Sequence, residues 1–238
     1  MPDMPDHRGG RAAEVFSAMR RMAPLITAVI PIGLVFGAAA AGNGLSPLEA
    51  TLMSALVFAG GSQFVAMDIW THPASWAALG VSAFLVNIRH VLMSASLAPK
   101  LGHFPGWRKY LSVLFLTDEG WAVAETHAAT ATLTPLWYAA AVIPFYLAWV
   151  ASGLAGSLAG AFLGDPAVTG LDFVFSAVFI VLVMNFWKGA RTGLVLLASG
   201  LSAVLVHAAV PGVWYILAGA LAGVATAVLM PERKEVTA

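Results

Sequence analysis

An amide, a guanidinium and an imidazole occur close together at Asn87, Arg89 and His90, inside an apolar run that extends from residue 74 to residue 98. A run of this length can cross a bilayer, whose hydrocarbon core takes about 20 helical residues. Charged groups at that depth are costly, so they usually face a protein interior or a water-filled path and have a function. Arg89 stands ten residues before Pro99. That is about 15 Å along a helix, farther than its side chain comfortably reaches, so we expect Arg89 to line a cavity.

Two adjacent acids, Asp118 and Glu119, lie near the middle of another apolar segment, residues 109 to 127. A carboxylate at membrane depth needs a counter-charge or a proton, and Arg89 is the nearest candidate along the chain. One acid could stay paired with Arg89 while the other binds and releases a proton, a role also open to His90. The alternative is a static ion-pair network that contains both acids.

Other chemistry has weaker support in the sequence. The six histidines share no metal-ligand spacing and the chain has no cysteine, so we expect no metal site and no cofactor. The sequence Gly-Gly-Ser-Gln at residues 60 to 63 matches a G-x-S pattern, and His207 could act as base for Ser62 in an intramembrane serine hydrolase. Because that alternative leaves the buried charges unexplained, we expect a protein that is not an enzyme.

Membrane helices must position these groups. Of 238 residues, 60% are hydrophobic and only 10% are charged, with a mean hydropathy of +0.84. Soluble domains carry roughly 25% charged residues. The net charge of zero gives no reason to expect a nucleic-acid partner. We therefore expect an all-α, polytopic protein of the inner (plasma) membrane.

Apolar segments of spanning length predict one transmembrane domain over residues 23–230. A flexible cytoplasmic tail of residues 1–22 precedes it, and a C-terminal tail of residues 231–238 follows. The segment lengths predict about 6–8 membrane segments. The candidate segments are residues 23 to 41, 48 to 70, 74 to 98, 109 to 127, 135 to 162, 171 to 187, 192 to 209 and 212 to 230.

The distribution of basic residues predicts the orientation, because short cytoplasmic loops are enriched in Lys and Arg. Four arginines before residue 22 place the N-terminus in the cytoplasm. The next basic cluster, at residues 100 to 109, is cytoplasmic only if one of the first three segments does not cross. We expect this of segment 48 to 70, because Gly60, Gly61 and Ser62 interrupt it and glycines are poor helix formers. Broken or re-entrant helices of this kind line binding cavities in transporters.

Lys188 and Arg191 pose the same question in the second half of the chain. They are cytoplasmic only if segment 171 to 187 does not cross, although that segment contains no Gly or Pro. Each half, residues 23–127 and 135–230, would then hold three crossings and one irregular element. Such an arrangement is compatible with an inverted repeat, a common plan of transporters.

Rows of small residues with a spacing of four predict close approach between helices. The contacts are expected within this chain, with a second membrane subunit as the alternative. The rows are Gly33 with Gly37, Ser152 with Gly156, Gly160 and Gly164, and Gly219 with Gly223.

Three ordered sequence blocks give the chain a family resemblance. They are Phe58-Ala-Gly-Gly-Ser-Gln-Phe64, Asn87-Ile-Arg-His-Val-Leu-Met-Ser-Ala-Ser-Leu97 and Leu116-Thr-Asp-Glu119. These blocks resemble the signature of the AzlC family, the large subunit of branched-chain amino acid permeases, most strongly from about residue 24 to residue 127. The chain departs from the family pattern in two places. A Tyr is common where Met93 stands, and a Thr-Phe pair where Gly120 and Trp121 stand.

The resemblance implies export of branched-chain or similar amino acids by alternating access, together with a small hydrophobic subunit of the AzlD type. A zwitterionic amino acid needs a cation for its carboxylate and an anion for its ammonium group. Arg89 could bind the carboxylate with a bidentate fork, and Asp118 or Glu119 could bind the ammonium group. Gln63, Asn87 and the freed backbone of the helix break would complete the polar shell. A passive channel for small polar solutes is the remaining alternative.

Overall fold

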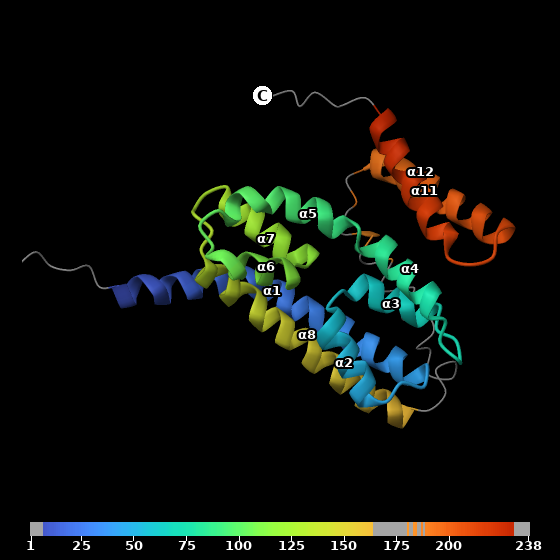
Figure 1. Ribbon diagram of the computed structural model, residues 1–238, viewed down its shortest axis with the longest axis horizontal. Coiled ribbons are helices and arrows are strands. Elements are labelled where there is room, and N and C mark those ends of the chain that lie inside the picture. The colour runs from blue at the N-terminus through green and yellow to red at the C-terminus, as the bar shows by residue number, and fades with distance from the viewer. Residues whose placement is uncertain (1–6, 164–179, 181–182, 185–186, 188, 231–238) are drawn as a thin grey trace, which may run out of the picture. The chain divides into compact units, whose positions relative to one another are not determined.

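The computed structural model describes residues 7–163, 180, 183–184, 187 and 189–230, and all regular structure in these residues is helical (Figure 1). The described residues form two compact units. Residues 7–67 and 87–163 belong to the first unit, and residues 68–86 and those from 180 onward belong to the second. The predicted all-α membrane fold is confirmed for this part of the chain.

The first unit contains most of the helices. They are α1 (His7–Gly42), α2 (Pro47–Val57), α3 (Gly60–Asp68), α5 (Arg89–Leu97), the short 3₁₀ helix η1 (Ala98–Leu101), α6 (Gly106–Leu114), α7 (Asp118–Ala128) and α8 (Pro135–Leu163). The second unit is built mainly from α4 (Trp76–Asn87), α11 (Ala190–Ala209) and α12 (Trp214–Leu229).

Within the described residues, four helical stretches are long and apolar enough to cross a membrane by length and composition. They are Gly10–Gly42, Trp76–Leu101, Pro135–Gly160 and Ala190–Ala209, and the shorter apolar helices are Pro47–Val57 and Trp214–Leu229. Segment 171 to 187 lies almost entirely outside the described residues, so the predicted irregular element of the second half stays a prediction.

Helix α1 is longer than the sequence predicted. It has 36 residues. At 1.5 Å per residue this is about 54 Å, well beyond the roughly 30 Å of a hydrocarbon core. Residues 7–22, expected to be a flexible tail, form its first turns instead. The stretch from Arg11 to Ala23 contains neither Gly nor Pro and consists mostly of Ala, Arg and Met, which favour helices.

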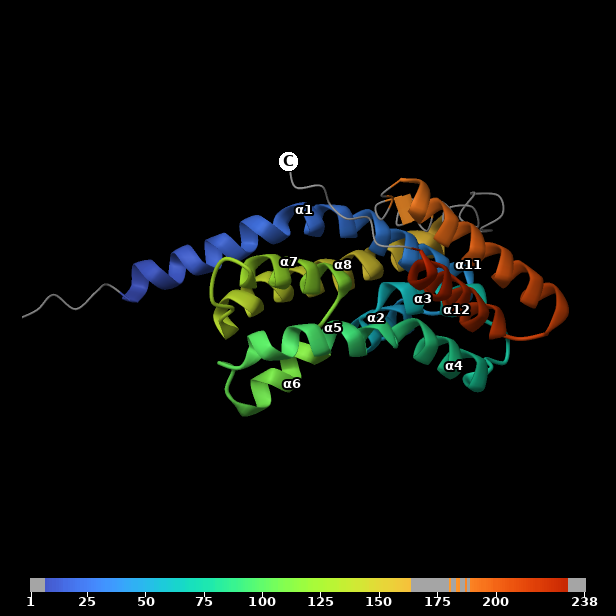
Figure 2. The ribbon, with the colours of Figure 1, turned by 90° about the horizontal axis from the view of Figure 1, so that it is seen from above.

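Helices α1 and α8 pack along each other and form the core of the first unit (Figure 2). The small-residue rows make this contact. A Cβ added to Gly37 would lie 2.0 Å from the carbonyl oxygen of Gly153, and one added to Gly156 would lie 2.0 Å from that of Leu34. The rows therefore pack within this chain, as expected. Gly164 lies outside the described residues.

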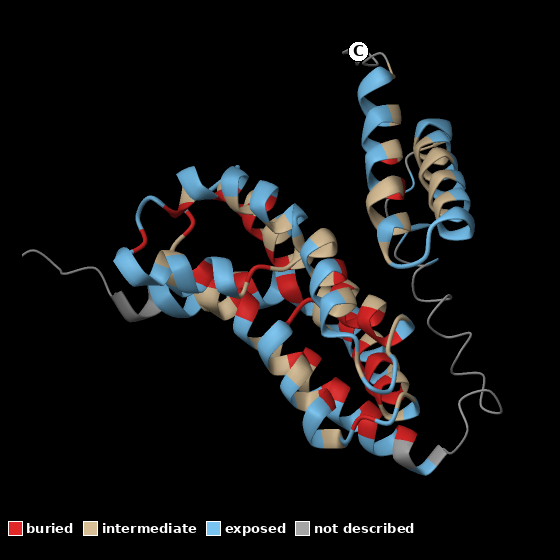
Figure 3. Ribbon diagram, turned by 45° about the vertical axis from the view of Figure 1, so that its right-hand side comes forward, coloured by how far each residue is buried: buried red, intermediate tan, exposed pale blue. Residues whose placement is uncertain are grey.

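Helices α11 and α12 also pack through small residues, but they bury fewer side chains than α1 and α8 do. Gly219 and Gly223 face Ser199 in α11. Among the described residues, α11 has no buried side chain and α12 buries only these two glycines, so the pair is mostly exposed in Figure 3. In the first unit, by contrast, buried residues line the inner sides of α1, α2, α3 and α8.

Replacing Gly156 by Ala should destabilise the protein, because the new methyl group would overlap the backbone of Leu34. Overpacking of a close contact costs about 1–3 kcal/mol in the free energy of unfolding. The measurement is the melting temperature of the purified protein in detergent. Gly80→Ala is the matched control, since nothing lies within 4 Å of a Cβ at Gly80. Equal melting of Gly156→Ala and wild type would contradict the packing.

Three successive apolar segments consist of two helices joined by a break. Phe58 and Ala59 separate α2 from α3, and residues 115–117 separate α6 from α7. Between α4 and α5 the interruption is slight, because the single residue Ile88 keeps helical dihedral angles within the stretch Trp76–Leu101. The sequence predicted a break only in the first of these segments and placed it at Gly60, Gly61 and Ser62. Those three residues instead form the first turn of α3, directly after the break.

Candidate functional site

The break between α2 and α3 is held open by aromatic packing. Phe58 adopts φ 44° and ψ 41°, a left-handed conformation that is uncommon for a residue with a large side chain. Its ring lies edge-on to the ring of Tyr146 in α8, with centroids 4.9 Å apart. The Tyr146 hydroxyl also donates a hydrogen bond to the carbonyl oxygen of Ala55 (3.1 Å) in the last turn of α2. Such carbonyls lack a partner within their own helix, so Tyr146 stabilises the helix end.

Gln63 lies behind this break and is fully buried. Its amide oxygen accepts a hydrogen bond from the indole nitrogen of Trp149 (3.0 Å), and its amide nitrogen donates to the hydroxyl of Ser54 (3.4 Å). The Trp149 ring stacks on Phe36 of α1. Gln63 therefore connects α3 with α2 and α8.

The break between α6 and α7 lies beside the first one. The ring centroid of Phe115 is 6.3 Å from that of Phe58 and 5.2 Å from that of Tyr146. Thr117 then caps α7, because its hydroxyl oxygen accepts a hydrogen bond from the backbone N–H of Gly120 (3.1 Å). Asp118 and Glu119, expected in the middle of one long helix, occupy the first turn of α7. The positive end of the helix dipole stabilises carboxylates at that position.

Asn87 and His90 lie on either side of Ile88 and are neighbours, as residues three apart are along a helix. The carbonyl oxygen of Asn87 can only accept a hydrogen bond, so His90 donates from Nδ1 (3.1 Å). The other ring nitrogen of a neutral His90, Nε2, is then the acceptor. Within the part of the chain that the structure describes, the side-chain oxygen of Asn87 is buried without a hydrogen-bond partner. It is a polar group that a ligand could use.

An ion pair between Arg89 and Asp118 connects the start of α5 with the start of α7. An Nη atom of Arg89 lies 3.0 Å from a carboxylate oxygen of Asp118, as the sequence had suggested. The two side chains are 47% and 36% exposed, so the pair is more open than a sealed ion pair in a protein interior. Glu119 is half-buried beside Thr117. The first turns of α5 and α7 therefore bring one cation and two acids together.

A second ion pair lies about two to three helical turns beyond the Arg89–Asp118 pair and also connects α5 and η1 with α7. The ammonium group of Lys100 in η1 pairs with the carboxylate of Glu125. Ser96 accepts a hydrogen bond from the indole nitrogen of Trp121 (2.7 Å) and donates one to Glu125 (3.0 Å). Because the two ion pairs advance in the same direction along both elements, α5 and α7 run parallel.

The sequence contains a signal for the second ion pair. Lys100 stands eleven residues after Arg89, and Glu125 stands seven after Asp118. Both spacings return to nearly the same face of a helix with 3.6 residues per turn. The charge distribution predicts a basic loop at Lys100, whereas this residue lies in η1.

Replacing Glu125 by Gln should loosen the α5–α7 contact without removing the Arg89–Asp118 pair. The pair Lys100–Glu125 is about a quarter to a third exposed, so we expect a small loss of about 0.5–1 kcal/mol in the free energy of unfolding. Melting of the purified variant in detergent measures it. A collapse of folded protein in Glu125→Gln would contradict this modest structural role.

The residues proposed for a hydrolase do not meet in one described unit. Ser62 lies in α3 of the first unit, and its hydroxyl is buried without a hydrogen-bond partner among the described residues. His207 lies in α11 of the second unit, where its ring packs edge-on to Tyr215 of α12.

The arrangement suits a ligand that carries both charges. A cation and an anion 3.0 Å apart can separate to admit a carboxylate beside Arg89 and an ammonium group beside Asp118. The buried oxygen of Asn87 and the carboxylate of Glu119 add acceptors for N–H groups. The aromatic rings of Phe58, Phe115 and Tyr146 lie at the adjoining breaks.

Comparison with known proteins gives this constellation a family context. The profile of the family described as AzlC protein matches residues 24–163, which include all three breaks. A branched-chain amino acid transport protein AzlC of Bacillus subtilis is 27% identical over 172 residues, covering 72% of this chain and 67% of the relative.

Two further relatives extend the comparison. An uncharacterized membrane protein of Archaeoglobus fulgidus is 34% identical over 169 residues, covering 70% of this chain and 73% of the relative. The inner membrane protein YgaZ of Escherichia coli is 30% identical over 168 residues, covering 66% of each chain. No solved structure matches the chain.

Proposed function

Because this chain belongs to the AzlC family, we propose that it carries branched-chain or similar amino acids across the inner membrane. The observation that most supports this substrate class is the ion pair between Arg89 and Asp118 at the joined breaks. The name of the relative from Bacillus subtilis supports transport of branched-chain amino acids.

The substrate inserts between the two charges of the pair. Its carboxylate takes the place of Asp118 on the guanidinium of Arg89, where two parallel N–H groups fit a carboxylate. Its ammonium group takes the place of Arg89 on Asp118. One ion pair becomes two, so the substrate compensates the charges that it separates, and neither side chain is left without a partner.

The remaining site residues have separate roles in this proposal. The side-chain oxygen of Asn87 and the carboxylate of Glu119 accept N–H groups of the substrate. Gln63 has a positioning role, because its hydrogen bonds with Trp149 and Ser54 hold α3 against α8 and α2 at the break. Gly60 follows this break, and the Trp149 ring would lie only 3.2 Å from a Cβ there.

Alternating access uses the breaks as the moving parts. A broken helix can tilt one half while the other half stays packed, and α2 and α8 are packed against α1. We propose that the aromatic contact of Phe58 with Phe115 forms on one side of the substrate and opens when the site faces that side. The N-terminus lies in the cytoplasm in this proposal, and transport runs outward.

A proton could serve as the coupling ion. His90 has a ring nitrogen that does not take part in its bond to Asn87, and Glu119 lies next to the paired Asp118. Either group, or Asp118 itself once the substrate has left, can bind a proton on one side of the membrane and release it on the other. The two-subunit plan of AzlC-type permeases supports a small hydrophobic AzlD-type partner for this chain.

Counterflow in proteoliposomes tests the proposed function. Vesicles that contain this chain and a small AzlD-type subunit are loaded with unlabelled leucine and diluted into labelled leucine. A carrier should accumulate label transiently above its external concentration. Equilibration without overshoot would indicate a passive channel, and no uptake at all would overturn the proposed substrate. Vesicles without the small subunit show whether the partner is needed.

A further inference from the structure

An apolar groove of about 570 Å³ lies between α6 and α8, and no acidic residue lines it. At one end it shares Phe115 and Tyr146 with the aromatic contacts at the helix breaks. Its floor consists of buried side chains, Tyr138 and Val142 of α8. Exposed side chains form its rim, among them Leu111 of α6 and Ile143 and Leu147 of α8. A groove this apolar suits a hydrocarbon chain and not a zwitterionic amino acid.

Aromatic contacts fix the width of the groove. The hydroxyl of Tyr138 donates a hydrogen bond to the carbonyl oxygen of Ser112 (2.8 Å), which ties α8 to α6. Phe104 lies edge-on to Tyr138 at one end, and Phe115 lies edge-on to Tyr146 at the other. These contacts hold α6 and α8 at a fixed separation along the groove.

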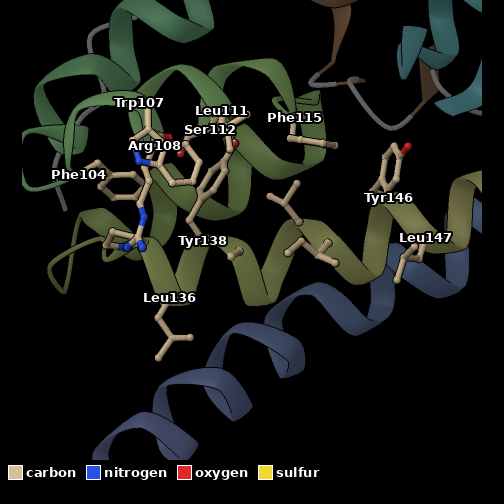
Figure 4. Close-up of a pocket in the computed structure, with 14 residues that line it drawn as sticks. Phe104, Trp107, Arg108, Leu111, Ser112, Phe115, Leu136, Tyr138, Tyr146 and Leu147 are labelled. Carbon is tan, nitrogen blue, oxygen red and sulfur yellow. Dashed lines mark hydrogen bonds between the residues drawn. The ribbon is translucent and has the colours of Figure 1, made fainter. Parts of the chain in front are cut away.

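The groove has one polar end. Arg108 is the single charged residue among the fourteen that line it, and it lies with Phe104 and Trp107 at the end near Leu136 (Figure 4). The opposite end, at Tyr146 and Leu147, is apolar apart from the tyrosine hydroxyl that bonds Ala55. The guanidinium carbon of Arg108 stands 5.6 Å from the centre of the Trp107 ring, which favours a cation at this place.

The length of the groove matches one leaflet of a bilayer. Its lining residues on α8 run from Pro135 to Leu147. That is about 18 Å of helix at 1.5 Å per residue, against about 15 Å for half of a hydrocarbon core. Exposed Trp107 and Tyr110 flank the charged end, and such aromatics gather at the membrane–water interface.

We propose that this groove binds an anionic glycerophospholipid of the bilayer. One acyl chain lies along Tyr138 and Val142, and the phosphate accepts hydrogen bonds from the guanidinium of Arg108. The basic loop at residues 100–109 is predicted to be cytoplasmic, the side on which anionic lipids give the membrane surface its negative potential. The lipid covers the exposed apolar rim and braces α6, whose end forms the break before Asp118.

Native mass spectrometry of the full chain released from detergent tests this proposal. Phosphatidylglycerol and phosphatidylcholine with the same acyl chains are titrated, and the fraction of protein with one bound lipid is measured. We expect phosphatidylglycerol to bind about 5- to 10-fold more tightly, the scale of one charge-assisted contact. Arg108→Gln should abolish this preference, and Arg108→Lys should restore part of it. Lys109→Gln is the matched control, since Lys109 does not line the groove.

A second variant tests the apolar part of the site. Ile143→Trp should fill the groove and weaken binding of both lipids at least about 5-fold, since the acyl chain then buries fewer CH₂ groups. Equal binding of the two lipids, equal loss in Arg108→Gln and Lys109→Gln, or unaltered binding in Ile143→Trp would overturn the proposal. Absence of lipid binding to the wild-type chain would also overturn it and would indicate a groove covered by protein. Size-exclusion profiles confirm that each variant is folded.

Discussion

Replacing Arg89 by Gln should reduce leucine export at least about 100-fold, because the substrate carboxylate then loses the cation that binds it. The substrate carboxylate would lose its charge-assisted hydrogen bonds to the guanidinium, each of which contributes about 1.5–3 kcal/mol, and each 1.4 kcal/mol corresponds to a tenfold change. Asp118 would also lose its partner at 3.0 Å. The measurement is export of labelled leucine from cells that contain equal amounts of each variant and of the small subunit.

The second ion pair provides the control for this prediction. Lys100→Gln removes a cation from the same side of the α5–η1 element and breaks the pair with Glu125. It should leave at least about a third of the export rate, because Lys100 binds no substrate group in the proposed site and a partly exposed ion pair contributes only about 0–1 kcal/mol. Arg89→Lys should retain charge but lose the bidentate fork, with a rate between those of Arg89→Gln and wild type. Export by Arg89→Gln at the level of Lys100→Gln would contradict the assignment of Arg89.

Leucine analogues that lack one charge should compete poorly for the site. Isoamylamine has no carboxylate and isocaproate has no ammonium group, so each leaves one member of the Arg89–Asp118 pair without a partner. Leaving a charged group unsatisfied costs about 2–5 kcal/mol, so we expect inhibition constants at least about 30-fold higher than that of unlabelled leucine. The measurement is inhibition of labelled leucine counterflow in proteoliposomes.

The two analogues also separate the two charges. Isocaproate retains the group that Arg89 binds, and isoamylamine retains the group that Asp118 binds. Because Asp118→Asn is itself expected to lose counterflow, direct binding to the purified variant is measured instead: the substitution should weaken binding of isoamylamine and leave that of isocaproate unchanged. Inhibition by either analogue as strong as that by leucine would mean that the charge at the missing position is not recognised.

Composition and residue type were enough to predict the fold class and a pairing of Arg89 with one of the adjacent acids, Asp118 or Glu119, but not which of the two. A charge at membrane depth requires a partner, and Asp118 is among the few acids in the neighbouring segments, so electrostatics alone pointed to the pairing. The small-residue rows were equally informative, because Gly156 and Gly37 approach backbone atoms that no larger side chain would allow.

The positions of the helix breaks were harder to predict. Gly60 and Gly61 are poor helix formers and predicted the break, yet the chain breaks at Phe58. The ring of this left-handed residue contacts Tyr146 and Phe115, both of which are distant along the chain. Local propensity contains no information about such contacts. The break before Asp118 was missed for a similar reason, although Thr117 is a good helix cap.

The length of α1 shows the opposite error. The charges before residue 22 suggested a loose tail, because polarity was weighed more heavily than helix propensity. Arg11, Arg20 and Arg21 are helix formers, and they extend α1 beyond the thickness of a membrane.

Reversing the charges of the pair tests most directly whether Arg89 and Asp118 bind the substrate or form only a static bridge. A static bridge works in either direction, whereas a site that also fixes the substrate side chain needs the cation on α5. The measurement is leucine counterflow by the double variant Arg89→Asp with Asp118→Arg, beside the matched reversal Lys100→Glu with Glu125→Lys. We predict that the second reversal transports at half the wild-type rate or more and that the first, though folded, stays at least about 30-fold below it, the effect of about 2 kcal/mol. Recovery of wild-type counterflow by the first reversal would contradict the account.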